Sequence, residues 1–104
     1  MRIAAVVALF SDLAEPELTM WVERGWVRPD LGDTGPVFHE IDVARVRLIR
    51  DLRGAMGIED DTISLVLSLL DQVYELRGGL RSVMRAVEAQ PEAVRAAVLA
   101  AMQP

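Results

Sequence analysis

Residues 25–42 read GWVRPDLGDTGPVFHEID, and this stretch decides the fold. Two short apolar pairs, Trp26-Val27 and Val37-Phe38, flank a loop that is rich in glycine and proline. Glycine and aspartate supply the backbone conformations that tight turns require. The stretch therefore predicts a small β-hairpin at 26–39, of the kind that forms the wing of a helix-turn-helix protein.

The residues before the hairpin predict two short helices, at 3–12 (IAAVVALFSD) and at 16–24 (PELTMWVER). Pro16 suits the first turn of the second helix, and Gly25 suits its end. Two short helices joined by a tight turn are typical of a helix-turn-helix. We therefore expect a winged helix-turn-helix domain over residues 1–58.

The residues after the hairpin predict three more helices. The first, DVARVRLIRDLRGAMG, begins with Asp42 as N-cap and ends at Gly57. The second, DTISLVLSLLDQVYELRGGLRSVMRAV, is long, and Gly78-Gly79 is its weak point because each glycine costs about 1 kcal/mol relative to alanine. The third, EAVRAAVLAAM, is short and follows Pro91. The sequence thus predicts a mainly α protein whose winged domain is followed by a long and then a short helix.

The long helix is apolar on two sides. One stripe contains Ile63, Val66, Leu67, Leu70, Val73 and Tyr74. The other contains Leu65, Leu69, Leu76, Leu80, Val83 and Val87. A helix that is apolar on two sides must be covered twice. We expect the first stripe to face the winged domain and the second to form a homodimer. Residues 59–104 are thus predicted to be a dimerisation region that packs on the first domain as one compact unit.

The net charge of −5 lies in the first part of the chain. Residues 1–44 hold three arginines and eight acids, whereas residues 45–104 hold eight of each. DNA affinity depends largely on neutralising phosphates with basic residues. The hairpin region carries Asp30 and Asp33 where a DNA-binding wing normally has basic residues. This distribution argues against binding to nucleic acid.

Several classes of chemistry have no support in the sequence. There is no cysteine and one histidine, so thiolate and multi-histidine metal sites are excluded. His39 is the only good general base by residue type, and a structural or surface role is favoured because Glu40 alone does not complete a catalytic site. The acids at 59–61 favour a helix start over a cation site. We expect no enzyme activity, metal or cofactor. No signal-cleavage pattern and no membrane span of about 20 apolar residues is present, so a cytoplasmic location is expected.

Two groups of residues have alternative interpretations. Trp21 and Trp26 suit core packing, but Trp21 lies on the second helix of the helix-turn-helix and could instead anchor a partner. Four arginines, Arg45, Arg47, Arg50 and Arg53, could bind phosphate. A solvated helix face paired with Asp42, Asp51 and the hairpin acids is favoured for them.

The order of these elements resembles the MerR-type winged helix. The stretches GWVRP, PVFHEIDVARVRLIRDLR and ISLVLSLLDQVYELRGGLR are most similar to the CbpM family of chaperone-modulator proteins. The resemblance covers about residues 3–90. MerR transcription factors usually carry an Arg-Tyr-Tyr type sequence on the second helix, whereas this chain reads Thr19-Met20-Trp21. At this length, no separate effector domain like theirs is expected. The scaffold is therefore expected to be retained and the DNA-reading residues lost.

The resemblance implies that the protein binds the basic J-domain of a DnaJ-type co-chaperone and blocks its action on Hsp70. An acidic surface would complement such a domain. The predicted contact residues are Glu15, Glu17, Trp21, Glu23, Asp30, Asp33, Glu40, Asp42, Glu59, Asp60 and Asp61. The alternative is a MerR-like DNA-binding transcriptional regulator.

Overall fold

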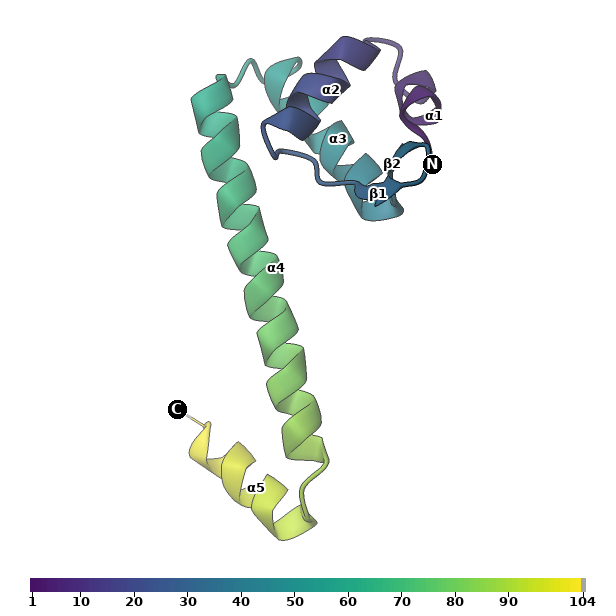
Figure 1. Cartoon of the computed structure of the whole chain (residues 1–104). Helices are drawn as coiled ribbons and strands as arrows, with labels where there is room; N and C mark the ends of the chain where they lie inside the picture. Colours follow the sequence, from purple (N-terminus) through teal and green to yellow (C-terminus); the bar gives the residue numbers. More distant parts are fainter. Residues whose placement is uncertain (104) are drawn as a thin grey trace. The chain divides into compact units, whose positions relative to one another are not determined.

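The computed structural model describes residues 1–103, which contain helices and one two-stranded sheet (Figure 1). The elements are α1 (Ile3–Ala8), α2 (Glu15–Glu23), β1 (Asp30–Gly32), β2 (Gly35–Val37), α3 (Glu40–Arg53), α4 (Asp60–Glu88) and α5 (Glu92–Ala101). This confirms the predicted order of two short helices, a hairpin, a helix, a long helix and a short helix. The chain divides into two units, one comprising Met1–Leu67 and the other beginning at Ser68.

The first unit encloses the hydrophobic core of the molecule. Its buried apolar side chains are Val6, Phe10, Leu13, Leu18, Trp21, Trp26, Val27, Phe38, Val46, Ile49, Leu52, Ile63 and Leu67. The last two come from the first turns of α4, and Trp26 Nε1 donates a hydrogen bond of 3.0 Å to Ser64 Oγ. These contacts explain why the first unit extends to Leu67, beyond the boundary at residue 58 that the sequence predicts.

Helix α1 is shorter than the sequence predicts, because it ends at Ala8 rather than at residue 12. The amides of Leu9 and Phe10 donate to carbonyls three residues earlier, so the chain tightens into a turn. Phe10 and Leu13 are then buried in the core. The apolar run therefore serves both the helix and the turn that follows it.

The hairpin is antiparallel, with Asp30 opposite Val37, Leu31 opposite Pro36 and Gly32 opposite Gly35. Gly35 has a φ of 131°, a conformation that strongly favours glycine. The end of the hairpin is bound to the start of the chain, because Met1 and Phe38 exchange backbone hydrogen bonds of 2.7 and 2.9 Å. The predicted positive φ is confirmed for Gly35 but not for Asp33, because only glycines have a positive φ among the described residues.

The start of α3 corrects the predicted N-cap. His39, not Asp42, is the N-cap, and the two residues form a capping box. The His39 ring accepts the backbone N–H of Asp42, while the His39 N–H donates to the Asp42 carboxylate over 2.8 Å. His39 Nε2 also lies 2.7 Å from Asp30 Oδ2, which joins the hairpin to the helix. The helix ends at Gly54, before the predicted stop at Gly57.

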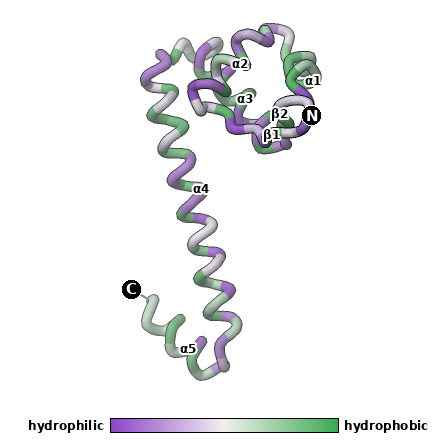
Figure 2. Tube along the Cα trace, viewed as in Figure 1, coloured by the Kyte–Doolittle hydropathy of each residue, from purple (hydrophilic) through white to green (hydrophobic). Residues whose placement is uncertain are grey.

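The second unit exposes its apolar residues. Helix α4 continues through Gly78-Gly79 without a break, and apolar and polar residues alternate along it (Figure 2). From Ser68 to Gln103 no described side chain is buried. The most exposed apolar residue of α4 is Leu76, at 73%. Near its end, α4 and α5 together form an apolar groove of about 470 Å³ lined mainly by Leu80, Val83, Met84, Val87, Leu99 and Met102.

The glycine pair predicts a stabilising substitution. A Cβ at Gly78 meets nothing within 4 Å, so Gly78→Ala is expected to stabilise the middle of α4 by about 1 kcal/mol. Gly57→Ala is the matched control, because Gly57 has a φ of 61° and alanine there is strained. Amide hydrogen exchange around residue 78 is expected to slow about fivefold in the first variant. Thermal unfolding is expected to occur at a lower temperature in the second. Unchanged exchange in Gly78→Ala would contradict a regular helix there.

Candidate functional site

The outer face of α2 is acidic and lies opposite its buried face. Glu15, Thr19 and Glu23 follow one another at four-residue spacing, and Pro16 and Met20 lie beside them. Together they line a shallow depression of about 550 Å³. Met20, one of the residues that line it, is 43% exposed. Helix α2 therefore presents an exposed methionine together with two carboxylates.

One group of the predicted contact acids is already engaged within the protein. Glu17 pairs with Arg53 over 3.4 Å, and Asp60 pairs with both Arg24 at 2.7 Å and Arg53 at 3.2 Å. Asp30 bonds to His39, and the carboxylate of Asp42 caps α3. Asp42 is only 7% exposed, so its predicted role as a contact for a partner is wrong. The ion pairs and the helix cap that these acids form give each of them a structural role.

The remaining predicted acids carry no ion pair or side-chain hydrogen bond to any described residue, and all are exposed. They are Glu15, Glu23, Asp33, Glu40, Glu59 and Asp61. We call these six residues the open acidic group. All six belong to the first unit. A carboxylate with no internal partner is free to pair with a cation from another molecule.

The hairpin adds an apolar residue that the sequence analysis missed. Leu31 lies on β1 and is 91% exposed, the highest value among the large apolar side chains of the described residues. It is flanked by Asp30 and is close in sequence to Asp33. The sequence offered a signal for this residue, because Leu31 is an apolar residue between residues that predict a turn. The sequence pattern was interpreted through the turn residues and charges of the loop, and Leu31 was assigned no role.

Trp21 does not form part of an exposed surface. Its side chain is 1% exposed and packs 6.4 Å from Trp26, measured between ring centroids. The predicted role of Trp21 as an exposed anchor is therefore wrong, and core packing holds for both tryptophans. The spacing of Leu18, Trp21 and Val22 on one side of α2 already favoured this outcome.

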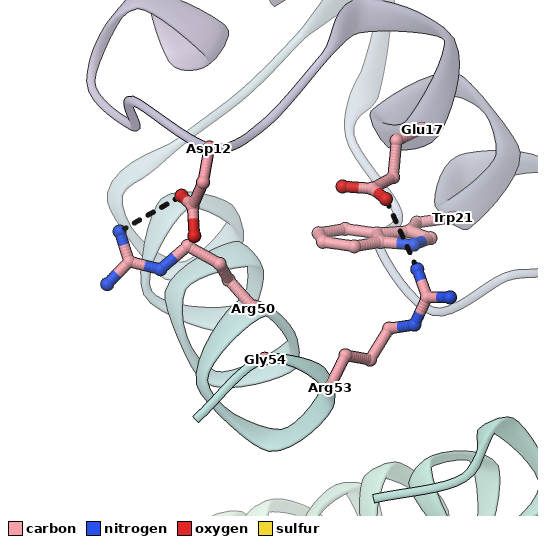
Figure 3. Close-up of a pocket in the computed structure, with 6 residues that line it drawn as sticks. All are labelled: Asp12, Glu17, Trp21, Arg50, Arg53 and Gly54. Atoms are coloured by element: carbon pink, nitrogen blue, oxygen red, sulfur yellow. Dashed lines mark hydrogen bonds and ion pairs between the residues drawn. The ribbon is translucent and has the colours of Figure 1, made fainter. Parts of the chain in front are cut away.

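The arginines of α3 are mostly neutralised or stacked. Arg50 lies 3.1 Å from Asp51 and 3.8 Å from Asp12, and it stacks over Phe10 at 5.0 Å. Arg53 bridges Glu17 and Asp60. Figure 3 shows Arg50 directed toward Asp12 and Arg53 directed toward Glu17. The expected pairing with Asp51 is confirmed for Arg50. Because Arg50 and Arg53 already pair with internal carboxylates, they offer little unpaired positive charge to a phosphate.

The two arginines beside Asp60 lower the pKa of this carboxyl below its usual value of 3.8. The hydrogen bond from Arg24 contributes most. Partial burial of the carboxyl opposes it, and the charge of Arg53 reinforces it. A carboxyl whose pKa falls on folding stabilises the folded state above its unfolded pKa, and this stabilisation is lost as the pH falls through the folded pKa. The contribution of Asp60 is thus present at neutral pH and lost in acid.

Asp60→Asn is expected to lower the stability at pH 7 by about 0.5–1 kcal/mol, because the lost ion pairs are partly exposed. The difference from the unmodified chain is expected to shrink as the pH falls through the lowered pKa of Asp60. Asp61→Asn is the control, since Asp61 neighbours it at the same helix start without an ion pair. Urea unfolding at several pH values measures both. An equal effect of the two substitutions would assign the stabilisation to the helix dipole instead.

The described residues offer no group of three or more His, Cys, Asp and Glu side chains that could hold a metal ion. Among those residues, no helix combines the length and the apolar character that a membrane crossing requires. No family model, curated protein or solved structure matches the chain.

Proposed function

We propose that the protein is a regulatory adaptor that binds the basic surface of a partner protein through its open acidic group. The observation that carries this proposal is that six exposed carboxylates have no partner among the residues that the structure describes, while every other predicted contact acid has one. Unpaired carboxylates of one sign on one unit attract a basic partner and accelerate the encounter. The same surface repels the phosphates of DNA.

The sequence resemblance supports a MerR-like winged-helix scaffold and a J-domain as the partner. The hairpin then corresponds to a wing, and α2 to the helix that would enter a DNA groove. In our proposal this helix instead faces the basic helix of the J-domain. The adaptor would cover the surface through which the J-domain acts on Hsp70, and so would inhibit the co-chaperone by occlusion in the cytoplasm.

Two exposed apolar side chains give this surface a means of affinity beyond charge. Met20 lines the depression on α2, and Leu31 is exposed on the hairpin. Contacts that exclude water at the middle of an interface contribute most of its binding energy, and rim charges mainly set the rate and specificity. Met20 and Leu31 are therefore the proposed anchors, with the open acidic group of the same unit supplying the charge.

We further propose that the adaptor is a homodimer formed through α4. Apolar residues recur along this unbroken helix at alternating spacings of three and four residues, which is the pattern of a two-stranded coiled coil. This apolar series consists of Val66, Leu69, Val73, Leu76, Leu80, Val83 and Val87. Leu65 lies beside this series. The acids Asp71 and Glu75 precede Leu76, whereas Arg77, Arg81 and Arg85 follow it. An antiparallel pair brings the acidic half of one copy beside the basic half of the other, so this orientation is favoured.

Isothermal titration with the J-domain of the co-chaperone from the same organism tests the adaptor proposal. We expect saturable binding that weakens as salt increases, because charge pairing is screened. No heat at high micromolar concentration would overturn it. A gel-shift assay on duplex DNA at low salt tests the alternative. Tight, sequence-selective binding there would favour the transcriptional regulator.

A further inference from the structure

The core contains one polar atom for which the fold supplies no partner. Among the described residues, Trp21 Nε1 is the only buried side-chain nitrogen or oxygen without a hydrogen bond. Its neighbour Trp26 donates to Ser64, so the fold satisfies one indole and leaves the other unpaired. A buried donor without an acceptor costs about 1–3 kcal/mol, and native proteins rarely retain one without a reason.

This indole lines a cleft in the first unit. The cleft has a volume of about 240 Å³ and is lined by Asp12, Glu17, Trp21, Arg50, Arg53 and Gly54. In Figure 3 the nitrogen edge of the Trp21 ring is turned to the side where Glu17 and Arg53 meet. This volume is below the roughly 300 Å³ at which pockets for drug-sized ligands begin. It suits one small polar group.

Asp12 and Glu17 balance the charges of Arg50 and Arg53 in the lining of the cleft, so the unpaired donor is what favours an acceptor there. Arg53 and the Trp21 N–H are both donors, and Arg50 lies on the other side of the ring (Figure 3). Glu17 currently faces Arg53 over 3.4 Å, a long pair whose carboxylate is 40% exposed and makes no hydrogen bond to the indole. Exposed pairs of this kind contribute little stability, so another oxyanion can replace Glu17 at low cost.

We propose that this cleft is a binding site for a small oxyanion, which accepts hydrogen bonds from Trp21 Nε1 and from the Arg53 guanidinium. Glu17 then moves into solvent, while Arg53 keeps its contact with Asp60. Asp12 and Glu17 border the cleft, so a singly charged carboxylate fits better than a doubly charged phosphate. The site is independent of the proposed binding of a J-domain, and its test requires no partner.

Nuclear magnetic resonance of the full chain tests this directly. The chain has two tryptophans, so a ¹H–¹⁵N spectrum contains two indole N–H signals. Sodium acetate and sodium phosphate are titrated separately, with sodium chloride at matched ionic strength. We expect the Trp21 signal to move downfield and to saturate in the millimolar range, with acetate stronger than phosphate, while the Trp26 signal stays in place. A larger phosphate response would support the site and assign it to phosphate groups.

Variants separate a real site from a general salt effect. Glu17→Gln removes the competing carboxylate and is expected to tighten acetate binding about fivefold. Arg53→Gln is expected to weaken it at least tenfold. Arg47→Gln is the control, because Arg47 lies on α3 outside the cleft. An indole signal that neither anion moves, or that chloride moves equally, would overturn the proposal. The same holds if Glu17→Gln leaves the acetate affinity unchanged in a folded protein.

Discussion

Glu23→Lys is expected to weaken binding of the J-domain about tenfold, and Glu23→Lys combined with Asp33→Lys about 100-fold. Both acids are exposed, carry no internal ion pair, and belong to the first unit. Each reversal replaces an attraction with a repulsion, and tenfold in affinity corresponds to about 1.4 kcal/mol. Neither residue is buried, so the fold is expected to survive.

The chain provides a closely matched control. Glu23 is the last residue of α2 and Glu88 is the last residue of α4, so Glu88→Lys makes the same change at the same place in a helix. Both variants raise the net charge from −5 to −3. Isothermal titration at two salt concentrations measures their affinities. If Glu88→Lys weakens binding as much as Glu23→Lys, then overall charge rather than the open acidic group attracts the partner.

Leu31→Ala separates apolar anchoring from charge at the same surface. The side chain is almost fully exposed, so its removal leaves the core intact. We expect weaker binding with an unchanged dependence on salt, because the charges around the residue remain. If the affinity does not change, the contact lies on α2 rather than on the hairpin.

The order of the elements was accessible from the sequence because local signals specify it. Gly25, Pro16 and the turn residues of the hairpin act on the backbone nearest to them, and the structure follows them. The boundaries were less accessible where tertiary contacts decide them. Phe10 lies in the turn after α1, and its ring is buried in the core. This burial depends on tertiary contacts, which no local sequence pattern encodes.

The charges show the same division between local and tertiary information. A count of acids correctly locates the negative charge in residues 1–44. It cannot separate Asp60, held by two arginines, from Asp61, which has none. Arg24 and Arg53 reach Asp60 from distant parts of the chain, so the pairing exists only after folding. Of the eleven predicted contact residues, the structure thus gives five an internal partner or a buried position, and the other six form the open acidic group.

The His39 interaction explains why a capping position was misassigned. Asp42 has the residue type that is preferred at an N-cap, and the sequence places it before an apolar series. In the structure it instead occupies the third helical position of a capping box, and histidine serves as the cap. The signal for this arrangement was the spacing of the two residues, which is the spacing of a capping box.

Leu80→Glu is expected to convert the dimer into a monomer at about 100 μM, a concentration well above the dissociation constant of a typical obligate dimer. Leu80 lies within the apolar series of α4 and is 55% exposed in the single chain, so the substitution leaves the core of the first unit untouched. In a dimer it would bury two unpaired carboxylates at once. A buried charge without a partner costs about 3–5 kcal/mol. This cost corresponds to at least 100-fold in the dissociation constant of the dimer.

Ser82→Glu is the control, because it adds the same charge to α4 at a position outside the apolar series. Glutamate and leucine have similar helix propensity, so a change in association would not reflect loss of the helix. Light scattering coupled to size-exclusion chromatography measures the mass of each variant, and circular dichroism measures helix content. A dimer that persists in Leu80→Glu would place the contact elsewhere. A monomeric unmodified chain would mean that the exposed apolar side chains of α4 are covered by a different protein. The complex with the J-domain would then be tested first for contacts with α4.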